Sequence, residues 1–224
     1  MSESRTLESA VEFAENSEPR CPCILLLDVS YSMSGAPINA LNEGLRIFRD
    51  GLNQDGLTKK RVEIAIVTFG SKVKVVQEFV TVDRFWPQTI KVGGSTYMGA
   101  GIDKALDILE ARKALYNANS ISYYRPWVFM ITDGEPTDND LVVDRAAQRI
   151  RDEEARKKVA FFAVGVEGVN MTRLSQIVVR TPVKLKGLKF REMFLWLSAS
   201  MDRVSHSKLD EQVPLNSPAG WGSV

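Results

Sequence analysis

The chain has 224 residues, of which 29 are Lys or Arg and 28 are Asp or Glu, so its formal net charge at pH 7 is only +1. A chain of this length can bury about 70% of its unfolded surface in one large domain, without disulfides or metals to stabilise it. The balanced charge, and the lack of a basic stripe with interleaved aromatic residues, argue against general nucleic-acid binding.

The first 19 residues form an acidic, polar segment with no apolar stretch like that of a secretion signal. No run in the chain approaches the ~20 apolar residues needed to span a bilayer. Cys21 and Cys23 are too awkwardly spaced for an easy mutual disulfide, and two thiolates do not complete a zinc site, so we interpret them as reduced structural thiols. These features predict a cytoplasmic protein with no membrane partner.

Short, nearly continuous apolar runs alternate with segments of helical spacing along the chain. Such runs are typical of parallel strands that are covered on both faces of a sheet. The runs expected to form the central parallel sheet are Cys23–Leu27, Val62–Phe69, Trp127–Thr132 and Val159–Val166. Lys72–Phe79 follows across a Gly70-Ser71 turn at hairpin spacing, so it is predicted to add an antiparallel edge strand, and Val183–Leu188 is the candidate for the other edge.

Apolar residues spaced three and four apart predict amphipathic helices between these strands. Helices are expected after Pro37, at Ile102–Leu109 and at Leu141–Ile150, with the charged run Arg151–Lys158 as a solvated helix end. The apolar face of the first helix consists of Ile38, Leu41, Leu45, Phe48 and Leu52. Phe190–Val204 is rich in aromatic residues and Met, so it is predicted to be a helix that covers the sheet, with a partner-binding surface as the alternative.

Together these patterns predict an α/β fold with a doubly wound, mostly parallel central sheet, one antiparallel edge strand and helices on both faces. We expect one such domain over residues 20–207, after the acidic segment 1–19 and before a tail at residues 208–224. The tail carries Pro and Gly, and it either packs back through Trp221 or stays mobile.

A D-x-S-x-S triplet directly follows the first apolar run, where the predicted strand leaves the core. On an extended backbone, side chains two residues apart point the same way, so the Asp28 carboxylate and the hydroxyls of Ser30 and Ser32 can converge on one point. Hard oxygen ligands that converge in this way suit Mg²⁺ or a similar ion. The triplet therefore predicts part of a metal site.

Two further polar residues occupy loops that such a site can use. Thr96 lies in the glycine-rich loop Gly93–Gly99, and Asp133 follows the strand Trp127–Thr132 directly. In doubly wound sheets, ligands bind at the carboxyl ends of strands where the order of connection reverses, so we expect these residues to share a crevice with the triplet. Taken singly, each segment is equally typical of a helix cap or an ordinary turn.

In this order, the triplet, a Thr in a second loop and an Asp in a third loop resemble the von Willebrand factor type A domain with a metal-ion-dependent adhesion site. The resemblance implies that family's Rossmann-like fold. It also implies that the five residues hold a divalent cation, Mg²⁺, with Mn²⁺ or Ca²⁺ as alternatives. The second loop departs from the family's usual Gly-Gly-Thr-Pro-Met-Gly, because Ser95 replaces a glycine and Tyr97 the proline, and Ser95 stays an alternative to Thr96 as the ligand.

A narrower resemblance is to the bacterial TerY and YegL group of tellurium-resistance-associated proteins. The segments Val62–Gly70, Tyr123–Trp127 and Trp196–Met201 carry it. It implies partners among tellurium-resistance proteins, protein kinases and phosphatases, in a stress-response or signalling complex.

The donor set itself predicts docking and not catalysis. Two carboxylates and three neutral hydroxyls neutralise at most the charge of one divalent ion, and such an ion keeps positions open to exchange. It would attract an outside anion, most simply a Glu or Asp side chain of a partner protein. We therefore expect a metal-dependent protein–protein interaction module that is not an enzyme.

Two other functions stay open. A metal-dependent hydrolase would need a general base, and the candidates are Glu135 and Asp138, because His206 lies far along the chain and is expected to be a solvated surface residue. The chain has neither a phosphate-binding P-loop nor a G-x-S-x-G nucleophile turn. A metal-independent scaffold that binds partners through a surface such as Phe190–Val204 is the other alternative.

Overall fold

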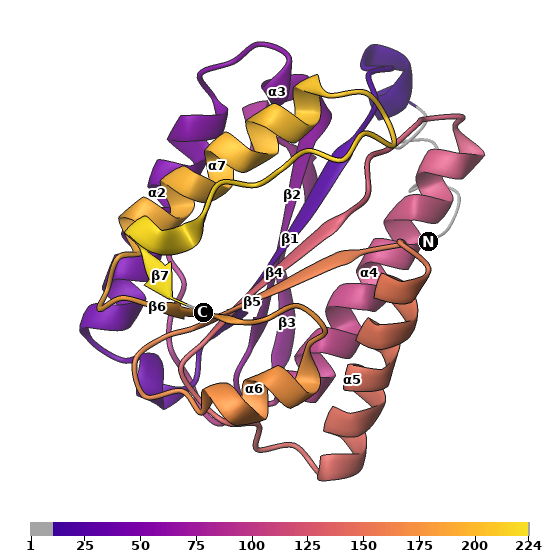
Figure 1. Ribbon diagram of the computed structural model, residues 1–224. Coiled ribbons are helices and arrows are strands. Elements are labelled where there is room, and N and C mark those ends of the chain that lie inside the picture. The colour runs from indigo at the N-terminus through magenta and orange to yellow at the C-terminus, as the bar shows by residue number, and fades with distance from the viewer. Residues whose placement is uncertain (1–10, 224) are drawn as a thin grey trace.

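The structure is a computed structural model and describes residues 11–223 of the chain. These residues form a seven-stranded sheet in the order β3-β2-β1-β4-β5-β6-β7, with helices on both faces (Figure 1). The strands are β1 (Cys21–Asp28), β2 (Val62–Phe69), β3 (Val73–Thr81), β4 (Trp127–Thr132), β5 (Ala160–Gly165), β6 (Val183–Leu185) and β7 (Gly222–Ser223). The α-helices are α2 (Ala36–Leu52), α3 (Thr58–Arg61), α4 (Met98–Ala118), α5 (Asp140–Ala155), α6 (Met171–Ile177) and α7 (Phe190–His206), and the 3₁₀ turns are η1 (Tyr31–Met33), η2 (Val82–Arg84) and η3 (Pro218–Gly220).

The central strand β1 sets the position of the crevice. It is parallel to β2 on one side and to β4 on the other, with Leu27 opposite both Thr68 and Ile131. The chain therefore adds β2 and β3 on one side of β1, and then crosses to the other side to add β4 and the later strands. The reversal between β1 and β4 confirms the predicted doubly wound fold and brings the segments after Asp28 and Thr132 together.

The two edges of the sheet differ in how well the sequence predicted them. β3 pairs with β2 in antiparallel register, which confirms the predicted hairpin. The expected strand Val183–Leu188 is shorter, ending at Leu185, and is not the edge, because β7 pairs with it in antiparallel register. The sheet thus has antiparallel strands at both edges, and a two-residue strand such as Gly222–Ser223 is too short for any alternation to reveal it.

Helices α2 and α7 cover one face of the sheet, whereas α4, α5 and α6 cover the other (Figure 1). The predicted apolar face of α2 is buried throughout. In α7 the side chains of Phe190, Met193, Phe194, Leu197 and Met201 are fully buried, so the prediction of a sheet-covering helix is confirmed. Leu141 is the exception to the predicted pattern, because it lies in the first turn of α5 and is 78% exposed.

The tail packs back onto the domain through Trp221, as one of the two expected alternatives proposed. Trp221 is 3% exposed, and its ring centroid lies 5.3 Å from that of Trp196 on α7. The Trp196 indole N–H donates to the Asn216 carbonyl at 2.9 Å, and the Lys186 N–H donates to the Trp221 carbonyl at 2.9 Å. These contacts place β7 at the edge of the sheet.

A buried ionic cluster lies at the amino ends of the strands. Glu63 on β2 is fully buried and accepts hydrogen bonds from Arg20, Arg112 and the Tyr116 hydroxyl. Residues 11–15 form a helical turn that places Phe13 over Tyr116, with ring centroids 5.8 Å apart. The described part of the N-terminal segment is therefore packed on the domain.

The two cysteines are buried on β1 and unpaired, which confirms their interpretation as structural thiols. Burial raises the pKa of the Cys21 thiol to about 12 and raises that of Cys23 further. No helix within residues 11–223 is long and apolar enough to cross a membrane.

Candidate metal centre

The D-x-S-x-S triplet folds into a tight loop at the end of β1. Asp28, the last residue of the strand, is fully buried, and its Oδ1 accepts the Ser30 N–H at 2.8 Å. The hydroxyls of Ser30 and Ser32 are 2.9 Å apart. The chain beyond Ser30 is the 3₁₀ turn η1 and is not extended, so this turn, and not strand alternation, brings Ser32 to Ser30. The two hydroxyls lie together as predicted, but strand alternation, the expected reason, was wrong for Ser32.

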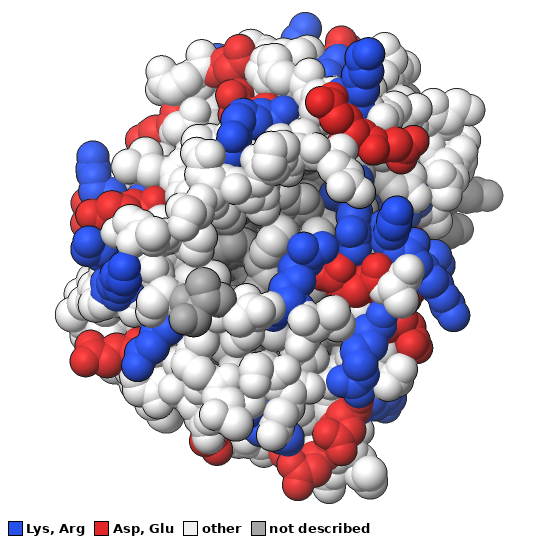
Figure 2. All heavy atoms as spheres, viewed as in Figure 1, with Lys and Arg blue, Asp and Glu red and all other residues white. Residues whose placement is uncertain are grey.

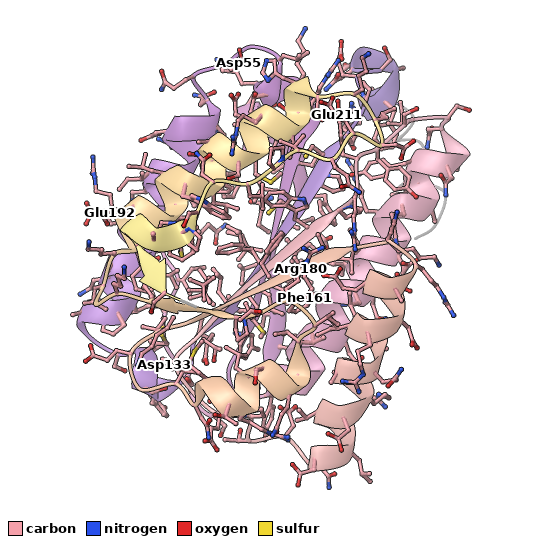
Figure 3. All side chains as sticks on the ribbon, viewed as in Figure 1. Asp55, Asp133, Phe161, Arg180, Glu192 and Glu211 are labelled. Carbon is pink, nitrogen blue, oxygen red and sulfur yellow. The ribbon has the colours of Figure 1, made fainter. Side chains whose placement is uncertain are left out.

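The loop after β4 meets this triplet directly. The Ser32 hydroxyl donates to Asp133 Oδ1 at 2.7 Å, and the Thr132 hydroxyl donates to Asp28 Oδ2 at 2.6 Å. These contacts join residues more than a hundred positions apart in the sequence. Asp133 lies at the lower end of the view in Figure 3, at the carboxyl ends of the strands.

The glycine-rich loop supplies Thr96 and turns Ser95 away. Thr96 is 5% exposed, whereas Ser95 is exposed and donates its N–H to the Ser71 hydroxyl. Backbone groups make the hydrogen bonds of Thr96: its N–H donates to the Thr137 hydroxyl, and its carbonyl accepts the Thr137 N–H, both at 2.9 Å. The Thr96 hydroxyl has no hydrogen-bond partner within residues 11–223, so its oxygen is available to coordinate an ion.

Two glycines shape the space between the three loops. Gly94 has a φ of 87°, a conformation that favours glycine, and it starts the turn that carries Thr96. A Cβ atom on Gly134 would lie 3.3 Å from Thr96 Oγ1 and 3.8 Å from Asp28 Oδ2. The side-chain oxygens of the first and second loops thus border one small space that the missing Cβ leaves open.

The electrostatics of this space favour a cation. Burial raises the pKa of Asp28 to about 6, against hydrogen bonds from Ser30 and Thr132 that lower it, and the nearby Asp133 raises it further. Burial also raises the pKa of Asp133, against the hydrogen bond from Ser32. Two desolvated carboxylates near one another are unfavourable when both are ionised, and a cation close to both would relieve this cost.

The donor set fits a divalent ion with hard-ligand preference. Two carboxylates and three hydroxyls supply only oxygen, which Mg²⁺, Mn²⁺ and Ca²⁺ prefer, and no thiol or imidazole from residues 11–223 lies among them. The five residues named from the sequence therefore lie together, on three loops at one end of the sheet.

The supporting roles of three residues were not predicted from the sequence. Thr132 orients Asp28, Thr137 clamps the Thr96 loop, and Asp138 accepts the N–H groups of Gly99 and Ala100 at 3.0 and 3.2 Å. Asp138 thereby caps the start of α4 from the neighbouring loop. A carboxylate at a helix N-terminus satisfies free N–H groups, but only the fold shows which helix it caps.

We expect Asp138→Ala to lower the free energy of unfolding by about 1 kcal/mol, because it leaves the first N–H groups of α4 without their acceptor. Urea denaturation followed by circular dichroism measures this loss. Asp144→Ala is a matched control, since Asp144 is an exposed carboxylate on α5 without a hydrogen bond or ion pair to another described residue. Equal stability of the two variants would contradict the capping role.

The possible general bases are already engaged. Glu135 accepts from the Asn170 side-chain amide at 2.7 Å, and Asp138 caps α4. His206 is a surface residue, as predicted, and lies at the end of α7 between Asp55 and Asp202. Potential metal-ligand atoms of Asp55, Asp202 and His206 lie within 4.8 Å of one another. Figure 3 shows Asp55 at the opposite end of the molecule from Asp133, so this cluster is separate from the candidate metal centre.

The sequence matches a known family over most of its length. The family model of the von Willebrand factor type A domain matches residues 23–184, well over half of the chain. The chain belongs to this family. The resemblance found in the sequence is thereby confirmed at the level of the family. No curated protein has a sequence that matches this von Willebrand factor type A protein.

Solved structures show the same fold at low sequence identity. Proximal thread matrix protein 1 from the mussel byssus has a TM-score of 0.56 and 17% identity, over 84% of this chain and 49% of that chain. The protein VWA2 from Sulfolobus acidocaldarius has a TM-score of 0.54 and 19% identity, over 82% and 46%. The pilus adhesin SpaC from Lactobacillus rhamnosus GG has a TM-score of 0.62 and 13% identity, over 85% and 31%.

This von Willebrand factor type A chain therefore spans half or less of the length of each of these proteins. At such identities the likeness shows the fold alone. One structure of the mussel protein, with a TM-score of 0.50 and 18% identity, is described as having a zinc-occupied metal-ion-dependent adhesion site.

Proposed function

We propose that this protein is a metal-dependent docking module, which binds an acidic side chain of a partner protein through a divalent cation. Asp28, Ser30, Ser32, Thr96 and Asp133 would hold the ion. The observation that carries the proposal is the convergence of three separate loops on one small space lined by oxygen atoms. Family membership and the zinc-occupied site of the mussel protein support it.

The chemistry of the donor set supports docking. When bound, a divalent ion would supply an electropositive position for a partner's carboxylate. The chain's own contribution is to orient the oxygens: Thr132 and the Ser30 N–H fix Asp28, and Ser32 fixes Asp133. Mg²⁺ is the first candidate, with Mn²⁺ and Ca²⁺ as alternatives, because all three accept oxygen-only sites.

The surroundings support docking over hydrolysis. A hydrolase needs a base positioned to activate water, and both candidate bases near the site have other hydrogen-bond partners. The neighbours in fold also include a pilus adhesin and a byssus matrix protein. We therefore propose a function without catalysis.

The narrower cellular role rests on the sequence resemblance. The segments similar to the TerY and YegL group form β2, the entry to β4 and part of α7, and these are mainly internal. They support common ancestry more than a particular partner surface. We propose a cytoplasmic role in a tellurium-resistance, stress-response or signalling complex, and co-purification from tellurite-treated bacterial cells with and without chelator tests it.

Replacing Thr96 by Ala should weaken Mg²⁺ binding about tenfold, because it removes one of the five proposed oxygen ligands, whereas Ser95→Ala should leave binding unchanged. The two residues are adjacent, but only Thr96 is buried among the ligand loops. Isothermal titration calorimetry of Mg²⁺, Mn²⁺ and Ca²⁺ into the chelator-stripped protein measures the affinity of each variant.

Circular dichroism of each variant confirms that it is folded before titration. A wild-type protein that binds none of the three ions would overturn the proposed function. An effect of Ser95→Ala equal to that of Thr96→Ala would leave the metal site in place but reassign its second-loop ligand.

A further inference from the structure

A groove of about 530 Å³ opens beside the ligand loops, between the start of β3 and the segment 88–94. Its size lies within the range of roughly 300–1,000 Å³ that is usual for ligand clefts. Four of its lining residues belong to the loops that carry the candidate ligands: Val29, Tyr31, Gly93 and Gly94. The Tyr31 N–H donates to the Gly94 carbonyl at 3.0 Å. The groove therefore borders two of the loops that form the candidate metal centre.

All charged side chains that line this groove are lysines. Lys72 and Lys74 come from the β3 side, and Lys91 comes from the opposite wall. All three are exposed, and none of them forms an ion pair with another residue of the described part of the chain. Three unpaired ammonium groups thus gather in a chain whose net charge is only +1.

The charge of the groove is unlike that of the surface in Figure 2. On that face, Lys and Arg side chains are interspersed with Asp and Glu. The groove has no acidic lining residue, and its remaining walls include the apolar Val76, Ile90 and Val92. Tyr31 stands at its metal-site end and is 70% exposed. The groove is thus suited to a chain that carries several negative charges with some apolar surface between them.

We propose that this lysine groove, formed by Lys72, Lys74 and Lys91 with Tyr31 at one end, binds an acidic segment of the partner protein. One carboxylate of that segment reaches the metal centre, and neighbouring carboxylates pair with the lysines. This inference rests on the proposed function, because the metal centre anchors the segment. The lysines then select partners whose anchoring residue lies within a run of acidic side chains.

The three lysines attract the acidic segment jointly, and solvent screens this electrostatic attraction. One exposed ion pair contributes little, but three in a single groove together change affinity by about tenfold or more and speed association by attracting the acidic segment. The effect weakens as ionic strength rises, because the Debye length falls to about 8 Å near physiological salt.

The test uses a fluorescein-labelled pentaglutamate peptide, and a matched peptide with one central Glu between glycines, in fluorescence anisotropy titrations with Mg²⁺ or with chelator. The triple variant Lys72→Gln, Lys74→Gln, Lys91→Gln is compared with Lys104→Gln, Lys157→Gln, Lys158→Gln, which removes the same charge from exposed positions outside the groove. Calorimetry of Mg²⁺ alone shows whether each variant keeps the metal centre.

With Mg²⁺, we expect the groove variant to bind pentaglutamate at least tenfold more weakly than wild type, and the control variant to bind it within about twofold of wild type. Both variants should bind Mg²⁺ and the single-Glu peptide as wild type does. If the groove variant binds pentaglutamate like wild type, or if wild type does not bind it, the lysine groove is overturned while Mg²⁺ binding still supports the proposed function.

The other outcomes separate the two proposals. A wild-type protein that binds no Mg²⁺, and binds pentaglutamate equally with chelator, would overturn the metal-anchored segment together with the proposed function. A labelled oligouridylate of the same charge that binds more tightly than pentaglutamate, and loses binding in the groove variant, would identify a nucleic-acid site and overturn the acidic protein partner.

Discussion

Asp28→Asn should abolish divalent-ion binding and yet make the metal-free protein more stable than wild type at about pH 8, by on the order of 1–3 kcal/mol. Asp28 is fully buried, and burial raises its pKa from the ordinary 3.8 to about 6. Its ionised form is therefore unfavourable in the folded protein without a cation. Asn keeps one oxygen for the Ser30 N–H, and the Thr132 hydroxyl can either donate or accept.

The direction of the pKa shift of Asp28 determines how the stability difference between Asp28→Asn and wild type changes with pH. The folded state raises the pKa of Asp28, so the favourable contribution of its protonated form is complete below the unfolded pKa and is lost as pH rises through about 6. The stability gap between Asp28→Asn and wild type should therefore be small near pH 4 and grow between about pH 4 and pH 7. Comparing the variant with wild type removes the titration of groups that both proteins share.

Urea denaturation followed by tryptophan fluorescence, with chelator and then with Mg²⁺, measures this gap. Mg²⁺ should raise the unfolding midpoint of wild type and leave that of Asp28→Asn unchanged, because only the state that binds the ion is stabilised by it. A variant that still binds Mg²⁺ like wild type would refute the assignment of Asp28 as a ligand. A variant less stable than wild type at about pH 8 with chelator would show that the buried carboxylate is well compensated without metal.

Glu63→Ala should lower the free energy of unfolding by about 3–5 kcal/mol, because it leaves two buried guanidinium groups without their common partner. Glu63 Oε1 lies 2.8 Å from Arg20 Nε and 2.8 Å from an Arg112 nitrogen, and Tyr116 donates to the same carboxylate. Arg20 and Glu63 are fully buried, so water cannot replace the lost contacts. Hydrogen bonds and charge attraction from Glu63 raise the pKa of Arg112 against the opposing effect of burial, so Arg112 stays charged.

Urea denaturation of Glu63→Ala beside Asp50→Ala measures the effect against a matched surface pair. Asp50 pairs with Arg49 at 2.5 Å, but the Asp50 side chain is 57% exposed, so its removal should cost less than about 1 kcal/mol. Glu63→Gln keeps hydrogen-bond acceptors, and we expect it to lie between the two. A loss below about 1 kcal/mol for Glu63→Ala would show that the cluster is solvated or rearranges.

The central strands were predictable because local pattern and tertiary burial coincide there. Val62–Phe69 and Trp127–Thr132 are strands with the bounds that their apolar runs predict, since both faces of each strand are covered by helices. The start of α5 was less predictable, because Leu141 is apolar but faces solvent. The strand β7 was not predictable, because Gly222–Ser223 gains its place only from the docking of Trp221 on α7.

By itself, the sequence determined the family, the central parallel strands and the five candidate ligands, because apolar runs and the oxygen-bearing side chains that follow them are local features of the chain. The tertiary structure decided how the loops meet. The hydrogen bond from Thr132 to Asp28 joins positions 104 residues apart. The hydrogen bond from the Gly99 N–H, by which Asp138 caps α4, joins positions 39 residues apart. Lys72 and Lys91 become walls of one groove for the same physical reason: charge adds through space, and only the fold sets which charges are near one another.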